Sequence, residues 1–286
     1  MGLSGTTIIM SGGSRGIGEA IAVRAARDGA NVALLAKTDQ PHPKLPGTIH
    51  TAAAAIEDAG GHALPLVGDV RDDDFVTSAV EQTAAQFDGI DVVVNNASAI
   101  NLARTEDLPM KAYDLMNDIN CRGAFLLSKL SIPWLRKSTN NPHILTLSPP
   151  ISIDPKWFGR ATGYTIAKFG MSLVTLGLSE ELREDRIAAN SLWPRTAIDT
   201  AAVRNVVGAG LETHSRTPQI MADAAYEIMT KPSHEVTGQF FIDDDVLEDA
   251  GVTDFSVYLN GGREEDLALD FWSEPKGPYN PDLRLM

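Results

Sequence analysis

Two side chains one helical turn apart are suited to acid–base chemistry. Tyr164 and Lys168 stand at positions i and i+4 of a stretch expected to be helical near 162–184, so they share one face of that helix. A tyrosine with an ordinary pKa of ~10 is a poor proton donor at neutral pH, and a nearby cation lowers that pKa by favouring the phenolate. The pair is therefore suited to the proton transfer that accompanies movement of a hydride.

A glycine-rich loop lies near the start of the chain, between a predicted strand and a predicted helix. Its glycines have the spacing G-x-x-x-G-x-G. Glycine permits the tight turn and lets backbone N–H groups approach a pyrophosphate at the helix N-terminus. Such loops can also merely turn the chain, but Rossmann folds bind dinucleotides at this position. The residues expected to contact a dinucleotide are Gly12, Ser14, Arg15, Gly16, Ile17 and Gly18.

The end of the second predicted strand bears on which dinucleotide binds. NAD sites usually place an acid there, which accepts hydrogen bonds from the ribose 2′-hydroxyl. This chain has Lys37 there and Arg15 in the glycine loop, two cations suited to the 2′-phosphate of NADP. Both could instead be solvated surface charges, and Asp39 is close enough to serve NAD. We expect NADP, with NAD as the alternative.

Polar residues also end the third and fourth predicted strands. Asp69, followed by Val70, is expected to meet the adenine edge of the cofactor. The run Asn95, Asn96 and Ala97 ends the fourth strand, and its amides are expected to brace the loop around the cofactor. For Asn95 a purely structural role is an equal alternative. We therefore expect Asn96 and Ala97 at the cofactor.

Seven β-rich runs alternate with helical stretches along the chain. The expected strands are 6–10, 31–36, 62–70, 91–97, 143–148, 187–194 and 238–243, and the expected helices include 17–28, 51–59, 72–86, 111–137 and 162–184. Helix-length connections imply parallel pairing, and right-handed crossovers then place ligands at the carboxyl ends of the strands. The expected fold is α/β, a doubly wound three-layer Rossmann fold with a mostly parallel seven-stranded sheet.

The alternation of strands and helices ends near residue 243. We expect residues 1–243 to form a single Rossmann-type catalytic domain. From Asp244 the sequence is acidic and contains glycine and proline, so residues 244–286 are expected to be an acidic C-terminal extension. That extension would pack on the domain or on a neighbouring subunit. Whether it buries residues 255–259 and 271–272 is left open.

Charge and composition exclude several classes of function. The 286 residues carry 38 acidic and 24 basic side chains, and we expect no nucleic-acid partner, because phosphates need a basic surface. No run of eighteen apolar residues occurs, so no membrane span is expected. The single cysteine, Cys121, cannot form an internal disulfide, which indicates a reducing compartment. Because the sequence shows no clear targeting signal, we expect a cytoplasmic location. The histidines are far apart in the sequence, and no metal site is expected.

The order of these motifs resembles the short-chain dehydrogenase/reductase family. The residues found in family order are Gly12, Gly16, Gly18, Asp69, Asn95, Asn96, Ala97, Asn120, Ser148, Tyr164, Lys168 and Pro194. A Tyr-x-x-x-Lys pair occurs by chance in many helices, and its place in this order makes it specific. Segments such as LPLVGDVRD and YTIAKFGMS are similar to members that carry a sterol-carrier domain after the dehydrogenase domain. We expect this chain to lack that domain.

The resemblance implies an oxidoreductase that moves hydride between the nicotinamide and a carbonyl or secondary alcohol. Tyr164 would be the acid/base at the substrate oxygen, and Lys168 would lower its pKa and hold the nicotinamide ribose. Asn120 would bind a water of the proton relay. Pro194 and Thr196 would line the nicotinamide carboxamide. In this interpretation Tyr164 and Lys168 are also cofactor contacts.

Two departures from the family pattern concern the site. Ser148, which would hydrogen-bond the substrate oxygen, stands sixteen residues before Tyr164, farther than is usual, and Pro149 follows it. Either an insertion restores Ser148 to its role, or the role is lost and the chain binds a dinucleotide with weak or no turnover. The second departure is Arg195, where the family usually has glycine. It would contact the cofactor, contact a substrate carboxylate or point to water.

The partners implied are a small molecule and further copies of the chain. Trp157 and Phe158 lie close before Tyr164, where aromatic rings either favour a largely apolar substrate or fill the core. Family members commonly pair through the two long helices that flank the site. We therefore expect a carbonyl or alcohol substrate and a homo-oligomer, either a dimer or a tetramer.

Overall fold

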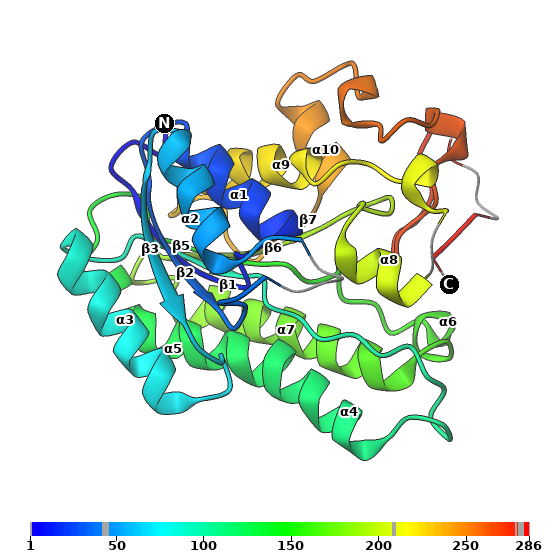
Figure 1. Ribbon diagram of the computed structural model, residues 1–286, viewed down its shortest axis with the longest axis horizontal. Helices are drawn as coiled ribbons and strands as arrows, with labels where there is room; N and C mark the ends of the chain where they lie inside the picture. The colour runs from blue at the N-terminus through cyan, green and yellow to red at the C-terminus, as the bar shows by residue number, and fades with distance from the viewer. Residues whose placement is uncertain (1, 42–45, 208–209, 278, 280–282, 286) are drawn as a thin grey trace.

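The structure, a computed structural model, describes residues 2–41, 46–207, 210–277, 279 and 283–285. In this part of the chain seven strands form one sheet: β1 (Thr7–Ser11), β2 (Asn31–Ala36), β3 (His62–Val67), β4 (Val92–Asn95), β5 (His143–Thr146), β6 (Ala188–Trp193) and β7 (Phe240–Ile242). Their order is β3-β2-β1-β4-β5-β6-β7, and all neighbours are parallel (Figure 1). The predicted doubly wound fold is confirmed, with a sheet that is parallel throughout.

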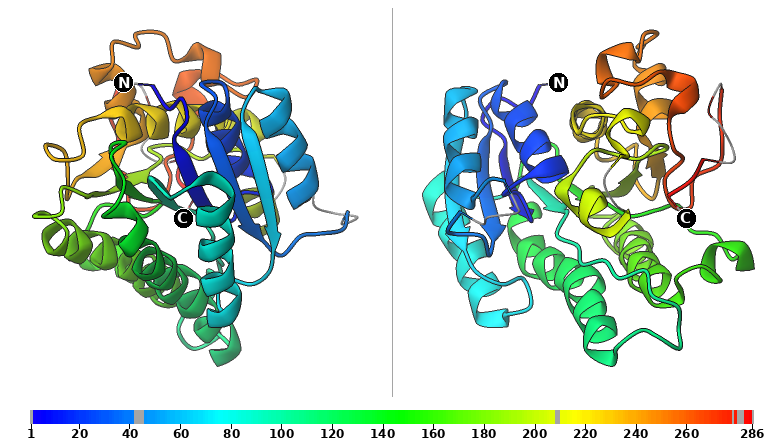
Figure 2. Two further views of the ribbon diagram at one scale, coloured as in Figure 1. Left: turned by 90° about the vertical axis from the view of Figure 1, so that its left-hand side faces the viewer. Right: turned by 45° about the vertical axis from the view of Figure 1, so that its right-hand side comes forward.

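Helices cover both faces of this sheet (Figure 2). They are α1 (Gly16–Ala26), α2 (Ile49–Asp58), α3 (Asp73–Phe87), α4 (Met110–Met116), α5 (Gly123–Leu135), α6 (Pro155–Phe158), α7 (Thr162–Glu181), α8 (Ala201–Val207), α9 (Gln219–Thr230) and α10 (Asp243–Asp249). Helices α1, α2 and α9 pack on one face, and α3, α5 and α7 pack on the other. Three short 3₁₀ turns lie at Glu212–His214, Ser256–Tyr258 and Glu264–Asp266.

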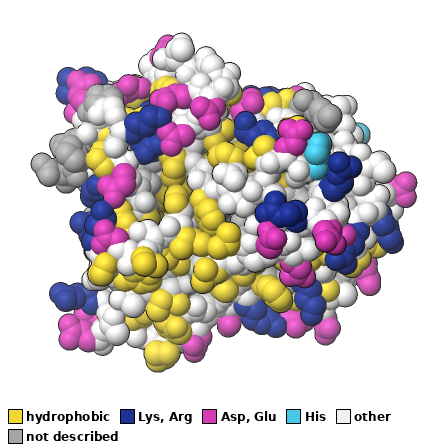
Figure 3. Space-filling model, turned by 180° about the vertical axis from the view of Figure 1, so that it is seen from behind, with side chains coloured by type: hydrophobic (Ala, Val, Ile, Leu, Met, Phe, Trp, Pro, Cys, Tyr) yellow, Lys and Arg dark blue, Asp and Glu magenta, His cyan; other side chains and the backbone are white. Residues whose placement is uncertain are grey.

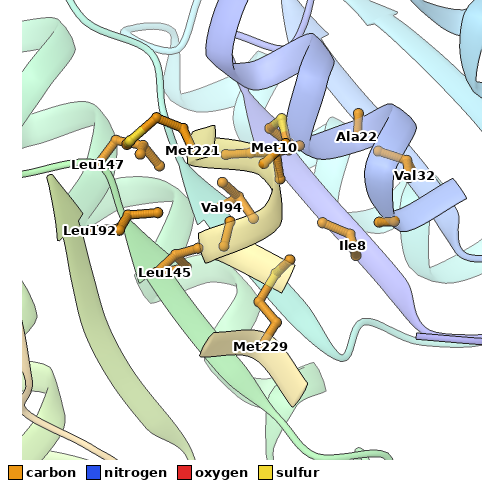
Figure 4. Packing of buried hydrophobic residues seen from close by; sticks show 14 of the residues in the cluster. Ile8, Met10, Ala22, Val32, Val94, Leu145, Leu147, Leu192, Met221 and Met229 are labelled. Carbon is orange, nitrogen blue, oxygen red and sulfur yellow. The ribbon is translucent and has the colours of Figure 1, made fainter. Parts of the chain in front are cut away.

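The central strand β1 contributes to a hydrophobic core on each side of the sheet. Ile8 and Met10 belong to the core beneath α1 and α9, where Met221 also packs (Figure 4). Ile9 belongs to the opposite core with Val93, beneath α3 and α5. Successive strand residues point to opposite faces, so a strand covered on both sides is apolar at most of its positions. This requirement explains the continuous apolar runs of the sequence.

Some predicted elements differ in detail from the structure. The helix predicted over 111–137 consists of α4, a π-helical segment over Asn117–Arg122, and α5. Such π-helical segments are rare and occur frequently at functional sites. The strand predicted over 62–70 ends at Val67, so Asp69 and Val70 lie in the loop at its carboxyl end. Among the described residues, none of the helices has the length and apolar composition that a bilayer crossing requires.

The described part of the C-terminal segment, residues 244–277, 279 and 283–285, packs against the residues that follow β6. Figure 1 draws it in orange to red beside α8 and α9. Phe271 and Trp272 are buried, whereas only Tyr258 is buried within the stretch 255–259. Residues 278, 280–282 and 286 of the segment lie outside the described residues. The domain boundary at 243 stays a prediction.

Candidate active site

A cleft of about 700 Å³ opens at the carboxyl ends of the strands. The loops after six successive strands, β1 to β6, all contribute to it. The predicted site residues that line the cleft are Gly12, Ser14, Arg15, Gly16, Ile17, Lys37, Asp69, Val70, Asn96, Ala97, Tyr164, Lys168 and Pro194. The predicted residues outside its lining are Gly18, Asn120, Ser148 and Thr196. The sheet thus brings together residues that are distant in the sequence.

The glycine loop packs closely against the end of β4. Gly12 has a φ of +77°, and a Cβ there would lie 2.8 Å from the Cα of Ala97. A Cβ on Gly18 would lie 2.6 Å from Nδ2 of Asn96 and 2.7 Å from the carbonyl oxygen of Gly12. Only glycine fits these two positions. The backbone therefore forms a cradle at the N-terminus of α1, where N–H groups favour an anion.

The two asparagines at the end of β4 make different contacts. Asn95 is buried, and its Nδ2 donates a hydrogen bond to Oγ of Ser128 at 2.9 Å. Asn96 instead donates from Nδ2 to the carbonyl oxygen of Gly12 at 2.8 Å, and so braces the glycine loop. The structural alternative for Asn95 agrees with these contacts, while Asn96 lines the cleft.

Lys37 and Arg71 both bind the carboxylate of Asp69 where β2 and β3 end. Lys37 is exposed, and its Nζ lies 3.0 Å from Oδ2 of Asp69. Arg71 binds the same carboxylate at 2.6 Å, and its hydrogen bonds hold the pKa of Asp69 well below the usual range.

Arg15 of the glycine loop donates to the carbonyl oxygens of Pro46 and Gly47, both at 3.0 Å. Asp39, the alternative acid for NAD, does not line the cleft.

Tyr164 and Lys168 lie one turn apart on α7, and both are buried at the cleft. Nζ of Lys168 donates to the carbonyl oxygen of Leu147 at 2.7 Å and lies 4.9 Å from the ring centroid of Trp193. Burial lowers the pKa of Lys168 to about 7.

Burial also raises the pKa of Tyr164, whereas a hydrogen bond with Ser98 lowers it. This direction is opposite to the one expected from the Tyr–Lys spacing. Burial removes the water that would solvate a phenolate, and it favours the neutral amine of Lys168 as well. Lys168 therefore lowers the pKa of Tyr164 less than the sequence pattern alone indicates.

Asn120 and Ser148 lie just outside the cleft. Asn120 is fully buried in the π-helical segment, where it exchanges two hydrogen bonds with the backbone of Ala99, at 2.7 and 3.0 Å. It thereby holds the loop that carries Ser98. Ser148 is fully buried, and within the described structure its Oγ has no hydrogen-bond partner; the same is true of Oγ1 of Thr196. Their roles stay predictions.

The aromatic residues before α7 pack within the fold. The ring of Phe158 meets that of Phe169 edge to face, with centroids 5.2 Å apart. Neither Trp157 nor Phe158 lines the cleft. Of the two alternatives considered for them, filling the core agrees with the structure.

Two residues of the cleft come from the C-terminal segment, and no sequence motif marked them. They are Asp270 and Phe271. The ring centroid of Tyr164 lies 6.0 Å from that of Phe271 and 5.5 Å from that of Trp272. The apolar pair 271–272 within an acidic stretch was a signal for burial, but nothing in the sequence tied it to α7. Ser98 is a further cleft residue that the motifs did not include.

Arg195 is the anchor of this segment. It is buried, and its Nε donates to both carboxylate oxygens of Asp244, at 2.8 and 2.7 Å. Its Nη2 binds Asp245 at 2.6 Å, and its Nη1 donates to the carbonyl oxygen of Glu274 at 3.0 Å. All three roles considered for Arg195 are wrong, because the guanidinium neither lines the cleft nor points to water. It holds the start of the C-terminal segment against the end of β6.

Comparison with known protein families and sequences agrees with this geometry. The model of the short chain dehydrogenase family matches residues 6–209. The chain is 57% identical over 283 residues to hydroxysteroid dehydrogenase-like protein 2 of Danio rerio, covering 99% of this chain and 64% of that protein. It is 52% identical over 275 residues to the Homo sapiens protein of the same name, covering 95% and 65%. The chain thus spans less than two-thirds of the length of these relatives.

Solved structures are similar to this chain as well. A putative dehydrogenase from Xanthomonas campestris is 53% identical, with a TM-score of 0.88, and the match covers 91% of this chain and 94% of that one. A short chain dehydrogenase from Mycobacterium thermoresistibile is 54% identical, with a TM-score of 0.89 and coverages of 98% and 99%. The NADH-dependent reductase A1-R′, solved with NAD, is 25% identical, with a TM-score of 0.68 and coverages of 84% and 95%.

Proposed function

Because the chain belongs to the short-chain dehydrogenase family, we propose that it transfers hydride between NADP and a carbonyl or secondary alcohol. The observation that carries this proposal is the single cleft surface on which the glycine loop and the Tyr164–Lys168 pair both lie. The bound nicotinamide would supply the hydride chemistry. The residues of the chain would bind the cofactor, orient the substrate and move the proton.

The cradle at the N-terminus of α1 fits the pyrophosphate of a dinucleotide. Gly12 and Gly16 line the cleft without a side chain, so the backbone there can approach a ligand closely. Asp69 and Val70 would flank the adenosine, because they line the same cleft beyond β3. Ala97 and Pro194, which line the cleft together with Tyr164, would lie toward the nicotinamide. Thr196, expected there from the family pattern, is buried and does not line the cleft.

Tyr164 would give its phenolic proton to the substrate oxygen in reduction and take it back in oxidation. The raised pKa keeps the phenol protonated at neutral pH, as a proton donor must be. An ammonium group on Lys168 would stabilise the phenolate that remains after the transfer. The burial of both side chains keeps bulk water from competing for that proton.

The substrate is proposed to be largely apolar. The lining of the cleft includes the apolar residues Ile100, Ile119, Leu147 and Phe271 beside a few polar groups such as Ser98 and Asp270. Pockets with mostly apolar walls and few polar groups bind apolar ligands through burial and orient them through the polar groups. The test is consumption of NADPH by the purified protein with a panel of aliphatic and aromatic ketones and aldehydes. Turnover that favours the apolar members supports the proposal.

A second candidate is a protein that binds dinucleotides with weak or no turnover. The observation in its favour is Ser148, which is fully buried and does not line the cleft. The same panel distinguishes the candidates, because NADPH binding without any consumption would support the second one. The cytoplasmic location expected from the sequence stays a prediction.

Replacing Lys37 with methionine is expected to weaken NADPH binding by about 10- to 100-fold, the effect of losing one charge-assisted hydrogen bond to the 2′-phosphate. The affinity for NADH, which lacks that phosphate, is expected to change little. Fluorescence titration of both cofactors measures the effect. The matched control is Lys111→Met, since Lys111 is exposed on α4 and outside the cleft. Equal loss for NADH and NADPH would contradict a role for Lys37 in phosphate recognition.

We also propose a homo-oligomer that forms through α5 and α7. These helices expose the large apolar side chains Phe125, Ile166, Leu173 and Leu176. Figure 3, a view from behind, shows hydrophobic side chains gathered on the lower part of the molecule, where α4, α5 and α7 lie in Figure 1. Contiguous exposed apolar surface of this kind commonly marks an interface.

Sedimentation velocity is expected to show that the wild-type protein is a dimer or a tetramer. The substitution Leu173→Glu is expected to shift the association equilibrium toward the monomer. Ile153→Glu is the control, because Ile153 is 90% exposed and lies outside both helices, in the loop before α6. A monomeric wild-type protein would contradict the proposed assembly.

A further inference from the structure

The register of β2 and β3 brings Lys37 next to Asp69. Ala36 pairs with Val67 at the ends of these parallel strands, and the N–H of Gly68 donates to the carbonyl oxygen of Ala36 at 3.1 Å. Lys37 and Asp69 therefore leave the sheet side by side, and Nζ of Lys37 lies 3.0 Å from Oδ2 of Asp69. The ammonium group that is proposed to bind the 2′-phosphate is thus paired with a carboxylate in this structure.

Arg71 binds the carboxylate of Asp69 through several hydrogen bonds. Its Nε donates to both carboxylate oxygens at 3.1 Å, and its Nη2 donates to Oδ2 at 2.6 Å. The backbone N–H of Arg71 donates to Oδ1 at 3.1 Å as well. These hydrogen bonds hold the pKa of Asp69 well below its usual range, so the carboxylate carries its negative charge at neutral pH.

The loop that carries Arg71 is tied to the π-helical segment. Nη1 of Arg122 donates to the carbonyl oxygen of Arg71 at 3.3 Å, and Nη2 of Arg122 donates to Oδ1 of Asp73 at 2.8 Å. The side chain of Lys37, in contrast, is 62% exposed, whereas that of Asp69 is 22% exposed. Asp69 and Arg71 therefore form the fixed part of the cluster, and Lys37 is the part that can move toward a ligand.

We propose, on the basis of the proposed function, that Arg71 is a positioning residue for cofactor recognition: by binding the carboxylate of Asp69, it leaves Lys37 free to bind the 2′-phosphate of NADP. Asp69 and Lys37 both line the cleft, whereas Arg71 does not. Arg71 therefore acts on the cofactor through Asp69.

The consequence concerns the choice between the two dinucleotides. A carboxylate without Arg71 would compete with the 2′-phosphate for the ammonium group of Lys37, and it would repel the phosphate. The same carboxylate would accept a hydrogen bond from the ribose 2′-hydroxyl of NAD, as acids at this end of the sheet do. The guanidinium of Arg71 offsets this charge, because its planar fork of donors occupies both oxygens of Asp69.

The test compares the dissociation constants of NADPH and NADH, measured by fluorescence titration of the full-length protein and its variants. Arg71→Met keeps most of the apolar stem and removes the charge. We expect the affinity for NADPH to fall by about 3- to 10-fold relative to that for NADH, the effect of one partly screened charge on a phosphate. Arg71→Lys keeps the charge and loses the fork, so it is expected to restore part of the preference.

A second substitution separates action through Asp69 from direct binding of the phosphate. Asp69→Asn removes the carboxylate charge, and it is expected to raise the preference for NADPH. Any contact of Asp69 with the adenosine is common to both cofactors and cancels in the ratio of their affinities. In the Asp69→Asn background, Arg71→Met is expected to leave this ratio unchanged, because the group on which Arg71 acts is gone.

Two outcomes of this cycle would overturn the proposal. If Arg71→Met lowered the preference for NADPH equally in both backgrounds, Arg71 would bind the phosphate itself. If Asp69→Asn lowered that preference, the carboxylate would instead hold Lys37 in place for the phosphate.

The control is Arg136→Met, which breaks a comparable ion pair outside the cleft, where Arg136 binds Asp185 at 2.8 Å. It is expected to leave the ratio of affinities unchanged. An unchanged ratio in folded Arg71→Met protein, with the fold checked by circular dichroism, would refute the role of Arg71 and leave the proposed function standing. Binding of neither cofactor by the wild-type protein would refute the proposed function and the role of Arg71 together.

Discussion

Replacing Tyr164 with phenylalanine is expected to lower kcat for carbonyl reduction by about 10²- to 10⁴-fold, the range that loss of a general acid produces. The substitution removes only the hydroxyl group. The ring keeps its contacts with Phe271 and Trp272, whose centroids lie 6.0 and 5.5 Å away. The affinity for NADPH is therefore expected to stay close to that of the wild-type protein. Steady-state kinetics and a fluorescence titration measure the two quantities.

The control for this substitution is Tyr226→Phe. Tyr226 lies on α9, where its hydroxyl donates to Asp28 at 2.9 Å, outside the cleft. The Tyr226→Phe variant also loses one phenolic hydroxyl group and one hydrogen bond, and the kcat of this variant is expected to remain unchanged. If Tyr164→Phe retained turnover near that of Tyr226→Phe, Tyr164 would not be the proton donor. If NADPH binding were lost along with turnover, the hydroxyl would serve mainly to hold the cofactor.

Replacing Arg195 with methionine is expected to lower the free energy of unfolding by about 3–5 kcal/mol, the cost of removing one partner from a buried ion pair. Asp244, only 1% exposed, would keep its charge without the two hydrogen bonds from Nε of Arg195. The bonds to Asp245 and to the carbonyl oxygen of Glu274 would be lost as well. Urea denaturation followed by circular dichroism measures the change.

Two further variants separate burial from charge. Arg195→Lys keeps the charge but loses the planar fork of donors, so a smaller destabilisation is expected. Arg263→Met removes an exposed guanidinium that is paired with Asp266 and Glu265, and such surface pairs contribute about 0–1 kcal/mol. A loss for Arg195→Met no larger than that for Arg263→Met would contradict the view of Arg195 as an anchor.

Much of the fold could be predicted from the sequence, because the relevant signals are local. Apolar runs such as the three valines that begin β4 indicate strands covered on both faces, and Gly12 and Gly18 show where the backbone must pack closely. The spacing of Tyr164 and Lys168 placed both side chains on one face of α7 at the cleft. In each case the residues that form the sequence pattern are only a few positions from the residues whose structure the pattern predicts.

The rest of the site depends on contacts between distant parts of the chain. Arg195 departs from the family pattern because Asp244 and Asp245 bind it, and the sequence alone does not reveal that pairing. Asp270 reaches the cleft through backbone pairing with the chain after β6. The direction of the Tyr164 pKa shift depends on burial, which the spacing of two residues does not determine.

The most direct test of the central claim is binding of NADPH and NADH to the purified wild-type protein. Trp193 lines the cleft and can transfer excitation energy to a reduced nicotinamide bound there. Titration with each cofactor is expected to quench the tryptophan emission, with NADPH binding more tightly than NADH. Tighter binding of NADH would contradict the assignment of Arg15 and Lys37 to a 2′-phosphate. Binding of neither cofactor would contradict the proposal that this cleft is the active site of a nicotinamide-dependent oxidoreductase.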